Sequence, residues 1–149
     1  MSELFILSPN TYFNSKIVFF KVYNKNMCGF LGKISLDYFA DENLVDANKR
    51  IICRGPDETK FLNQKNLDHN NFYFSFVFNR LSIIDLTDTA SQPMVSNNKE
   101  NLIMFNGEIY NYKELKEILL NKGITFNSKN SDTEVLLEGL SILGLDFIN

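Results

Sequence analysis

The residues with the clearest chemical potential are Met27, Cys28 and Gly29. An ionised cysteine thiol is a nucleophile, and an α-amino group has an unperturbed pKa of roughly 7.7–8.0. If Met27 were removed, Cys28 would carry both a nucleophile and a base that works near neutral pH, so no histidine partner would be needed. Gly29 would allow backbone or ligand to approach closely. For a Cys-Gly pair on its own, a buried cysteine in a core strand is the simpler interpretation.

Two further residues, Arg80 and Asp132, could handle charge on a small molecule. Arg80 lies between two apolar segments, where a guanidinium is costly unless it meets an anion. Its planar fork fits a carboxylate, which could belong to a ligand or to an Asp or Glu of the protein. Asp132 lies in the first turn of a predicted helix, where the helix dipole favours it, and it could also receive an ammonium group.

Asn106 and Gly107 follow an apolar segment and have two interpretations. Asn-Gly between β-like segments is typical of a tight hairpin turn. Alternatively, the glycine amide and the asparagine side-chain amide provide two donors for a developing oxyanion.

Hydrophobic patterns predict the elements that must position these residues. Aromatic and β-branched residues favour strands, and apolar positions with helical spacing favour helices. We expect residues 60–71, which are polar and rich in Asn, to form a loop, and Ile124–Phe126 to form a short strand. The predicted strands are 28–35, 72–78 and 102–106, and the predicted helices are 42–53, 112–122 and 132–143.

Local signals mark where these elements begin and end. The segment 54–57 (Arg-Gly-Pro-Asp) should stop the preceding helix and begin a tight turn, because proline fixes its own φ and restricts its neighbour. Ser131 and Glu134 form a capping-box pattern at the last helix. Gly123 and Gly144 are positioned to end helices.

Residues 1–26 precede the point where the chemistry begins. Phe5–Leu7 and Ile17–Phe20 have the composition of short strands. Three accounts of this extension are open: a mis-assigned start with Met27 as the true first residue, a propeptide, or an extension that blocks the Cys28 amine. We favour the first account, because Met27 precedes a small residue, as trimmed initiator methionines do.

Length and composition set the class of protein. The 149 residues suit one domain, and 44% hydrophobic and 22% charged residues are typical of a globular chain. A net charge of −3 argues against a broad nucleic-acid surface, and no signal peptide or apolar segment of spanning length is visible. We therefore expect a cytoplasmic protein with no membrane partner, whose Cys28 and Cys53 stay reduced. The single histidine, His69, argues against a histidine-based metal site.

Taken together, an ordered set of motifs resembles the N-terminal glutaminase domain of glutamine-hydrolysing asparagine synthases. That domain is a class II glutamine amidotransferase and an N-terminal-nucleophile hydrolase. The resemblance covers residues 27 to about 147. It implies an α+β fold with four αββα layers, in which two stacked antiparallel sheets lie between outer helices. The motifs are 27–29 (MCG), 54–57 (RGPD), 80–85 (RLSIID), 92–94 (QPM), 106–111 (NGEIYN) and 131–134 (SDTE).

By this resemblance, Cys28 would attack the side-chain amide of L-glutamine. Its α-amine would accept the thiol proton and later deliver it to the departing ammonia. Asn106 and Gly107 would form the oxyanion hole.

The resemblance also implies how glutamine would be held. Arg80 would bind the α-carboxylate, and Asp132 with Glu108 would bind the α-ammonium group. Backbone groups of four consecutive residues would line the same pocket: Leu81, Ser82, Ile83 and Ile84.

The implied product ammonia would serve ATP-dependent asparagine synthesis by a synthetase domain or subunit. We expect ATP and Mg only in that partner, and no cofactor or metal in this domain; a homodimer is left open.

The resemblance predicts residues 27–149 to be an amidotransferase domain whose C-terminal part is missing. Cys53 and Phe78 stand where relatives often have His. Two alternatives stay open: an inactive fragment or glutamine-binding subunit, and a related amidotransferase with another acceptor.

Overall fold

The computed structural model describes residues 3–7, 28–35, 42–65, 73–83 and 86–148. Within these ranges the chain is a mixture of helices and antiparallel strands, as an α+β fold requires. The chain divides into two compact units. Unit 1 comprises Met1–Leu7 and Ile83–Asn149, and unit 2 comprises Ser8–Ser82. Each unit has its own three-stranded sheet among the described residues.

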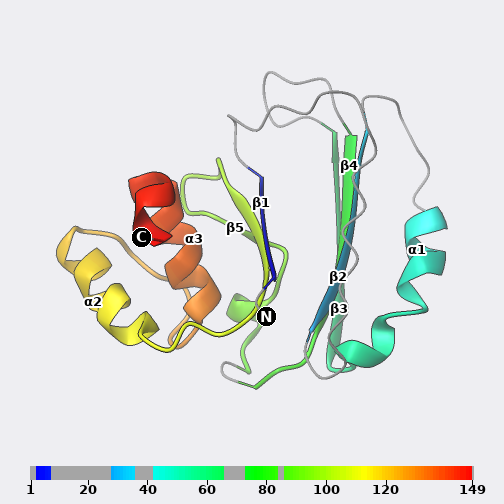
Figure 1. Ribbon diagram of the computed structural model, residues 1–149, viewed down its shortest axis with the longest axis horizontal. Helices are drawn as coiled ribbons and strands as arrows, with labels where there is room; N and C mark the ends of the chain where they lie inside the picture. Colours follow the sequence, from blue (N-terminus) through cyan, green and yellow to red (C-terminus); the bar gives the residue numbers. More distant parts are fainter. Residues whose placement is uncertain (1–2, 8–27, 36–41, 66–72, 84–85, 149) are drawn as a thin grey trace. The chain divides into compact units, whose positions relative to one another are not determined.

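Unit 2 is built on a sheet with the strand order β2-β4-β3 (Figure 1). All neighbouring strands are antiparallel, and the register opposes Gly29 to Asn79 and Glu58 to Arg80. The sheet therefore places the residues next to Cys28 beside the end of β4. The elements are β2 (Gly29–Ser35), α1 (Glu42–Asn48), a 3-10 turn (Ile52–Arg54), β3 (Glu58–Lys65) and β4 (Tyr73–Arg80).

The core of unit 2 is aromatic. Every residue of β4 after Tyr73 is buried, in agreement with its prediction as a strand covered on both faces. The Phe30 and Phe78 rings stack, with their centroids 6.1 Å apart. Packing of this kind fixes the central strand, whose end carries Arg80.

Two predictions in unit 2 were wrong. The helix predicted over 42–53 ends at Asn48, and a separate 3-10 turn leads into Gly55. The loop predicted over 60–71 is a strand from Glu58 to Lys65, and residues 66–71 lie outside the described residues. This strand pairs along its whole length with β4, so backbone pairing outweighs its polar composition.

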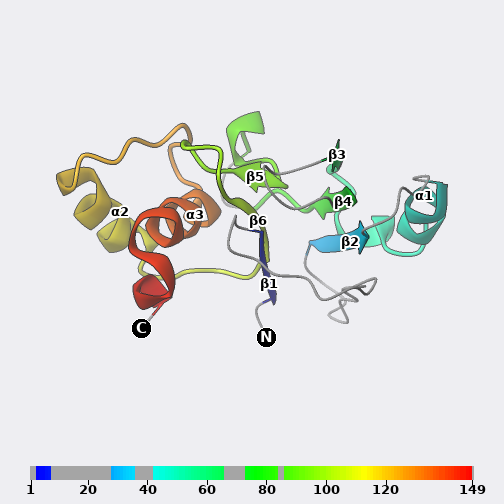
Figure 2. The same cartoon turned by 90° about the horizontal axis from the view of Figure 1, so that it is seen from above.

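Unit 1 has a sheet with the strand order β1-β6-β5, again antiparallel. Helix α3 packs on this sheet and α2 packs on α3 (Figures 1 and 2). Two apolar clusters hold the layers together, one between α3 and the sheet and one between α2 and α3. The elements are β1 (Glu3–Leu7), a 3-10 turn (Asp88–Ala90), β5 (Met94–Val95), β6 (Leu102–Asn106), α2 (Tyr112–Asn121), α3 (Asp132–Leu143) and a 3-10 turn (Gly144–Ile148).

Most predicted elements of unit 1 are confirmed. Phe5–Leu7 lies in β1, whereas Ile17–Phe20 lies outside the described residues. Asn106-Gly107 does not form a hairpin, because the chain continues from β6 towards α2 rather than into a pairing strand. The short strand predicted at Ile124–Phe126 was wrong: Ile124 is buried in the cluster between α2 and α3 instead.

The capping box at α3 is confirmed in part. The Ser131 hydroxyl accepts a hydrogen bond from the Glu134 amide (3.2 Å), as an N-cap residue does. The Glu134 carboxylate does not return to Ser131. It accepts instead from the amides of Asn127 (2.6 Å) and Ser128 (2.8 Å) and from the Ser128 hydroxyl. Glu134 therefore anchors the loop that enters α3.

None of the described helices has the length and apolar character needed to cross a membrane. His69 lies outside the described residues.

Candidate functional site

The predicted site residues fall into two sets, one in each unit. Unit 2 holds Cys28, Arg80, Leu81 and Ser82, and unit 1 holds Ile83 with the set Asn106, Gly107, Glu108 and Asp132. Ile84 lies outside the described residues. We describe the geometry of each set within its own unit.

The Cys28 thiol contacts the backbone of Leu81. The Leu81 amide donates a hydrogen bond to the sulfur (3.2 Å), and the thiol donates to the Leu81 carbonyl (3.6 Å). Cys28 is half-buried and precedes β2, and Leu81 follows β4, so the pairing of these strands sets this contact. The Leu81 backbone therefore holds the sulfur through both its amide and its carbonyl. Both Cys28 and Cys53 are free cysteines.

Arg54 holds the backbone of the same cysteine. Its guanidinium donates to the Cys28 carbonyl oxygen (3.1 Å), and Arg54 is only 9% exposed. A Cβ on Gly29 would lie 3.2–3.3 Å from the Arg54 side chain, so the glycine is what lets this side chain approach closely. The sequence analysis gave Arg54 no role beyond its motif.

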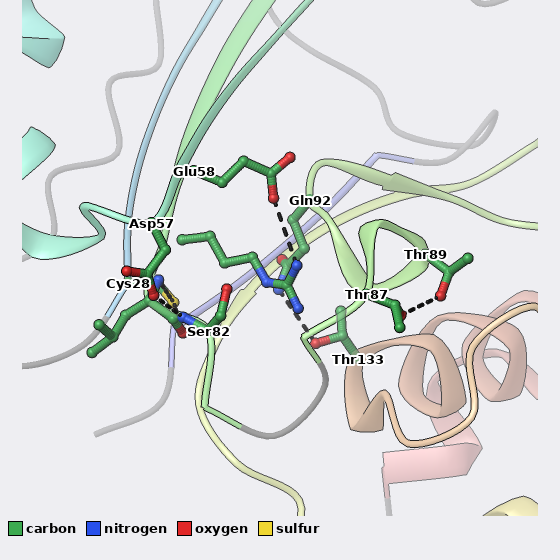
Figure 3. Close-up of polar contacts among 10 residues, drawn as sticks. Cys28, Asp57, Glu58, Ser82, Thr87, Thr89, Gln92 and Thr133 are labelled. Atoms are coloured by element: carbon green, nitrogen blue, oxygen red, sulfur yellow. Dashed lines mark hydrogen bonds and ion pairs between the residues drawn. The ribbon is translucent and has the colours of Figure 1, made fainter.

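The end of β4 is tied to the turn that follows Arg54 (Figure 3). The Asp57 carboxylate accepts from the Ser82 amide (2.7 Å), and the Asp57 amide donates to the Arg80 carbonyl (3.1 Å). A Cβ on Gly55 would lie 2.2 Å from the Asn79 carbonyl oxygen, so the turn packs directly on the β4 backbone. The motif 54–57 is therefore more than a helix stop: it fixes the residues beside the thiol.

Arg80 forms an ion pair with Glu58, with 3.6 Å between the charged atoms. The Arg80 side chain is nearly buried, and that of Glu58 is one-third exposed. Glu58 is thus a protein carboxylate that partners this guanidinium. A ligand carboxylate would therefore approach a guanidinium that already has a partner.

A buried amide pair supports β4 from α1. The Asn79 amide donates to Asn48 (2.6 Å), and Thr59 donates to the Asn79 side-chain oxygen (2.9 Å). Asn79 is fully buried. These contacts were missed, since a single sequence does not show that three polar residues so far apart meet.

In unit 1, the Asp132 carboxylate is occupied by protein donors. One oxygen accepts from the Ile109 amide (3.1 Å), and the other accepts from the Thr133 amide (2.7 Å) and hydroxyl (3.4 Å). Asp132 thereby ties the residues after Glu108 to the start of α3. Glu108 itself is exposed.

The Gln92 side chain bonds the backbone of β6 in the way that a neighbouring strand would. Its side-chain oxygen accepts from the Phe105 amide (2.6 Å), and its side-chain nitrogen donates to the Phe105 carbonyl (3.1 Å). The same nitrogen donates to Thr133 (3.3 Å), as Figure 3 shows. It is buried next to Asn106, which is 2% exposed. The sequence motif containing Gln92 gave no indication of this role.

Comparison with known proteins places these motifs in a family. The model of the glutamine amidotransferase domain matches residues 27–149. Asparagine synthetase [glutamine-hydrolyzing] 1 of Bacillus subtilis is 43% identical over 116 residues, which are 74% of this chain and 17% of that protein. Asparagine synthetase [glutamine-hydrolyzing] 2 of the same organism is 34% identical, over 83% of this chain and 16% of that protein.

A putative asparagine synthetase [glutamine-hydrolyzing] 2 of Methanocaldococcus jannaschii is 33% identical, over 82% of this chain and 25% of that protein. The chain thus spans between 16% and 25% of the length of these three relatives. No solved structure gives a significant match. The family match begins at Met27, directly before the thiol that contacts Leu81. The chain therefore belongs to the family of glutamine amidotransferase domains.

Proposed function

We propose that this chain hydrolyses L-glutamine to glutamate and ammonia through Cys28. The observation that carries the proposal is the thiol held by the Leu81 amide at 3.2 Å, at the first residue after Met27 in the family match. The Leu81 carbonyl also accepts from this thiol, so the backbone of one residue holds the sulfur in place. A free α-amine on the same residue would supply the base.

The proposed reaction has two steps, and its atoms balance with glutamine, water and Cys28 alone. The α-amine takes the thiol proton, sulfur attacks the amide carbon, and the proton passes to the nitrogen that leaves as ammonia. Water then hydrolyses the thioester to release glutamate and restore the thiol. Arg54 holds the Cys28 carbonyl, and so limits how the nucleophile turns.

The remaining roles are proposed from the family resemblance. Asn106 and Gly107 would stabilise the oxyanion, a contribution worth about 2.7–4 kcal/mol for one donor. Arg80 would bind the α-carboxylate, and Asp132 with Glu108 the α-ammonium group. The ion pair of Arg80 with Glu58 means that substrate would have to share or replace this partner. From the same resemblance we propose a fold of four stacked αββα layers for the domain.

The fate of the ammonia is a further part of the proposal. The relatives named above are glutamine-hydrolysing asparagine synthetases. We therefore propose that ammonia passes to a synthetase domain or subunit that makes asparagine with ATP and Mg. The free thiols of Cys28 and Cys53 fit a reducing compartment such as the cytosol.

Controlled release of the Cys28 amine tests the activity. A site-specific protease sequence replaces residues 22–27, so that cleavage leaves Cys28 as the first residue and keeps the upstream fragment in the sample. We expect glutamine-dependent ammonia release from the cleaved chain, and none from the uncleaved chain or from cleaved Cys28→Ala. Equal rates in the three samples would contradict the proposal.

One observation favours a second candidate, a glutamine-binding protein without catalysis. Glu3–Leu7, which precede Cys28 in this chain, form a strand of unit 1. A chain that kept these residues joined to Cys28 would have an amide in place of the basic amine. Calorimetric binding of glutamine to the uncleaved chain, with no ammonia release after cleavage, would favour this alternative.

A further inference from the structure

The strand β6 is paired on both of its edges, but in different ways. On one edge, β5 opposes only Leu102 and Ile103. Beyond the end of β5 on this edge, the Gln92 side chain bonds both backbone groups of Phe105. On the other edge, β1 opposes all five residues from Leu102 to Asn106. The β1 edge is therefore the one with a complete strand partner.

The contacts of Gln92 reveal which residues of β6 face β1. In an antiparallel sheet, the N–H and C=O of one residue point to the same edge, and those of the next residue point to the opposite edge. Phe105 directs both groups to Gln92. The backbone groups of Met104 and Asn106 therefore face β1, where the register opposes them to Phe5 and Glu3.

This alternation gives Asn106 a particular dependence on the N-terminal segment. Asn106 is the last residue of β6, it is buried, and within the described residues its strand partner is Glu3. An edge strand that lost its neighbour would leave a row of backbone groups without a ladder. Asn106 is also the residue to which the proposed function gives an oxyanion donor.

We propose that the β1 edge of β6 is a strand-acceptor site, that Glu3–Leu7 is its occupant, and that this pairing positions Asn106. An extended segment added to a sheet edge binds through its backbone, and this mode also works between separate chains. The occupant therefore stays on β6 when the chain is cut between Met27 and Cys28. Only the consequence for catalysis rests on the proposed function.

Two proline substitutions in the full chain provide a matched test. Phe5 is opposed to Met104 and its N–H faces β6, so Phe5→Pro replaces a ladder donor with a ring. The neighbouring Leu4 faces the other way, so Leu4→Pro leaves the ladder donors in place. Phe5→Ala replaces the same side chain as Phe5→Pro but keeps the N–H, and so separates the loss of the donor from the change of side chain.

Amide hydrogen exchange measured by NMR gives the readout. In Phe5→Pro we expect the Met104 and Asn106 amides to exchange about tenfold faster or more, while the Phe105 amide, held by Gln92, changes little. Leu4→Pro and Phe5→Ala should leave this alternating pattern intact. Equal exchange in Phe5→Pro and Leu4→Pro, or no change at Met104, would overturn the proposal.

Retention of the cleaved segment is the second measurement. After cleavage before Cys28, native mass spectrometry should find the upstream fragment bound to the rest of the chain, and Phe5→Pro should release it. Loss of the fragment from the unsubstituted protein would overturn the proposal. Neither readout depends on glutamine, so failure of the strand-acceptor site and failure of the glutaminase are distinguishable.

Discussion

At the scale of single residues, Cys28 is held at two points, its sulfur and its carbonyl, by groups of unit 2. Leu81 contacts the sulfur through its backbone, and Arg54 contacts the carbonyl of the same residue. The first contact fixes where the nucleophile lies and the second fixes the peptide group beside it. Together they hold both the side chain and the peptide group of Cys28, and in the proposed reaction such positioning would lower the entropic cost of reaching the transition state.

Arg54→Lys tests the second contact. Lysine keeps the positive charge but loses the planar fork that reaches the Cys28 carbonyl. We expect kcat for ammonia release from the cleaved chain to fall by about tenfold to a hundredfold, since small displacements of a nucleophile have effects of this size. KM for glutamine should change much less, because Arg54 is proposed to position the cysteine rather than to bind substrate.

A matched control for this substitution is Arg50→Lys, at an exposed position close by in the sequence. Its kinetics should equal those of the parent chain. An Arg54→Lys protein with unchanged kcat, or with only its KM altered, would argue that the contact with Cys28 has no positioning role.

The sequence indicated candidate residues for the site but said little about which groups of the protein they contact. Cys28 and Leu81 were both predicted for the site, and the structure joins them. The Arg80 ion pair with Glu58 was one of two open alternatives, because an arginine between apolar segments shows a need for an anion but not its source. Gln92 was missed, because an amide that replaces a strand neighbour has no sequence pattern of its own.

At the scale of elements, periodicity predicted the buried strands and the last two helices well, whereas the first helix ends at Asn48 rather than at residue 53. The strand over 102–106 and the helix over 132–143 have the predicted bounds, since their apolar residues face cores that the pattern reveals. The strand β3 could not be predicted, because its residues are polar. Its extended conformation follows from backbone pairing with β4, which the local sequence does not show. Likewise, nothing in Glu3–Leu7 identifies β6 as its neighbour.

The start of α3 offers a prediction about how an element is anchored. Glu134 is 3% exposed, and its carboxylate accepts from the amides of Asn127 and Ser128. Glu134→Ala would leave these donors without that acceptor, and we expect the free energy of unfolding to fall by about 2–3 kcal/mol. Ser131→Ala removes only the N-cap bond, with an expected loss of about 1 kcal/mol.

Urea unfolding followed by circular dichroism measures both losses. The relative size of the two losses is the important result. A reciprocal capping box would give Ser131 and Glu134 similar contributions to stability, whereas the contacts of the Glu134 carboxylate predict the larger loss for Glu134→Ala. A larger loss for Ser131→Ala than for Glu134→Ala would contradict the role given to the carboxylate.

At the scale of the whole molecule, the family match runs through both compact units. It begins at Met27 in unit 2 and continues to residue 149 in unit 1. The length and composition of the sequence do not reveal that residues 3–7 pair with the strand at 102–106. Long-range pairing of this kind is decided by backbone edges, which a hydrophobic pattern does not encode.

The pH dependence of folding provides a prediction at this scale. Burial raises the pKa of Glu138 above its usual value, and the negative charge of nearby Glu134 raises it further, while the hydrogen bond from the Asn97 amide opposes the shift. The folded state therefore binds this proton more tightly than the unfolded state. As a result, the free energy of unfolding falls as pH rises from the ordinary glutamate pKa through the raised folded value.

Glu138→Gln removes the titration and keeps an oxygen that can accept from Asn97. The stability of this variant relative to the parent should therefore increase with pH across the same window and then level off. The slope cannot exceed about 1.4 kcal/mol per pH unit, the limit for one proton. Glu117→Gln, on the exposed surface of α2, corrects for the change in net charge. Urea unfolding at closely spaced pH values measures the difference. A difference that is flat, or that falls as pH rises, would mean that folding does not oppose the charge on Glu138.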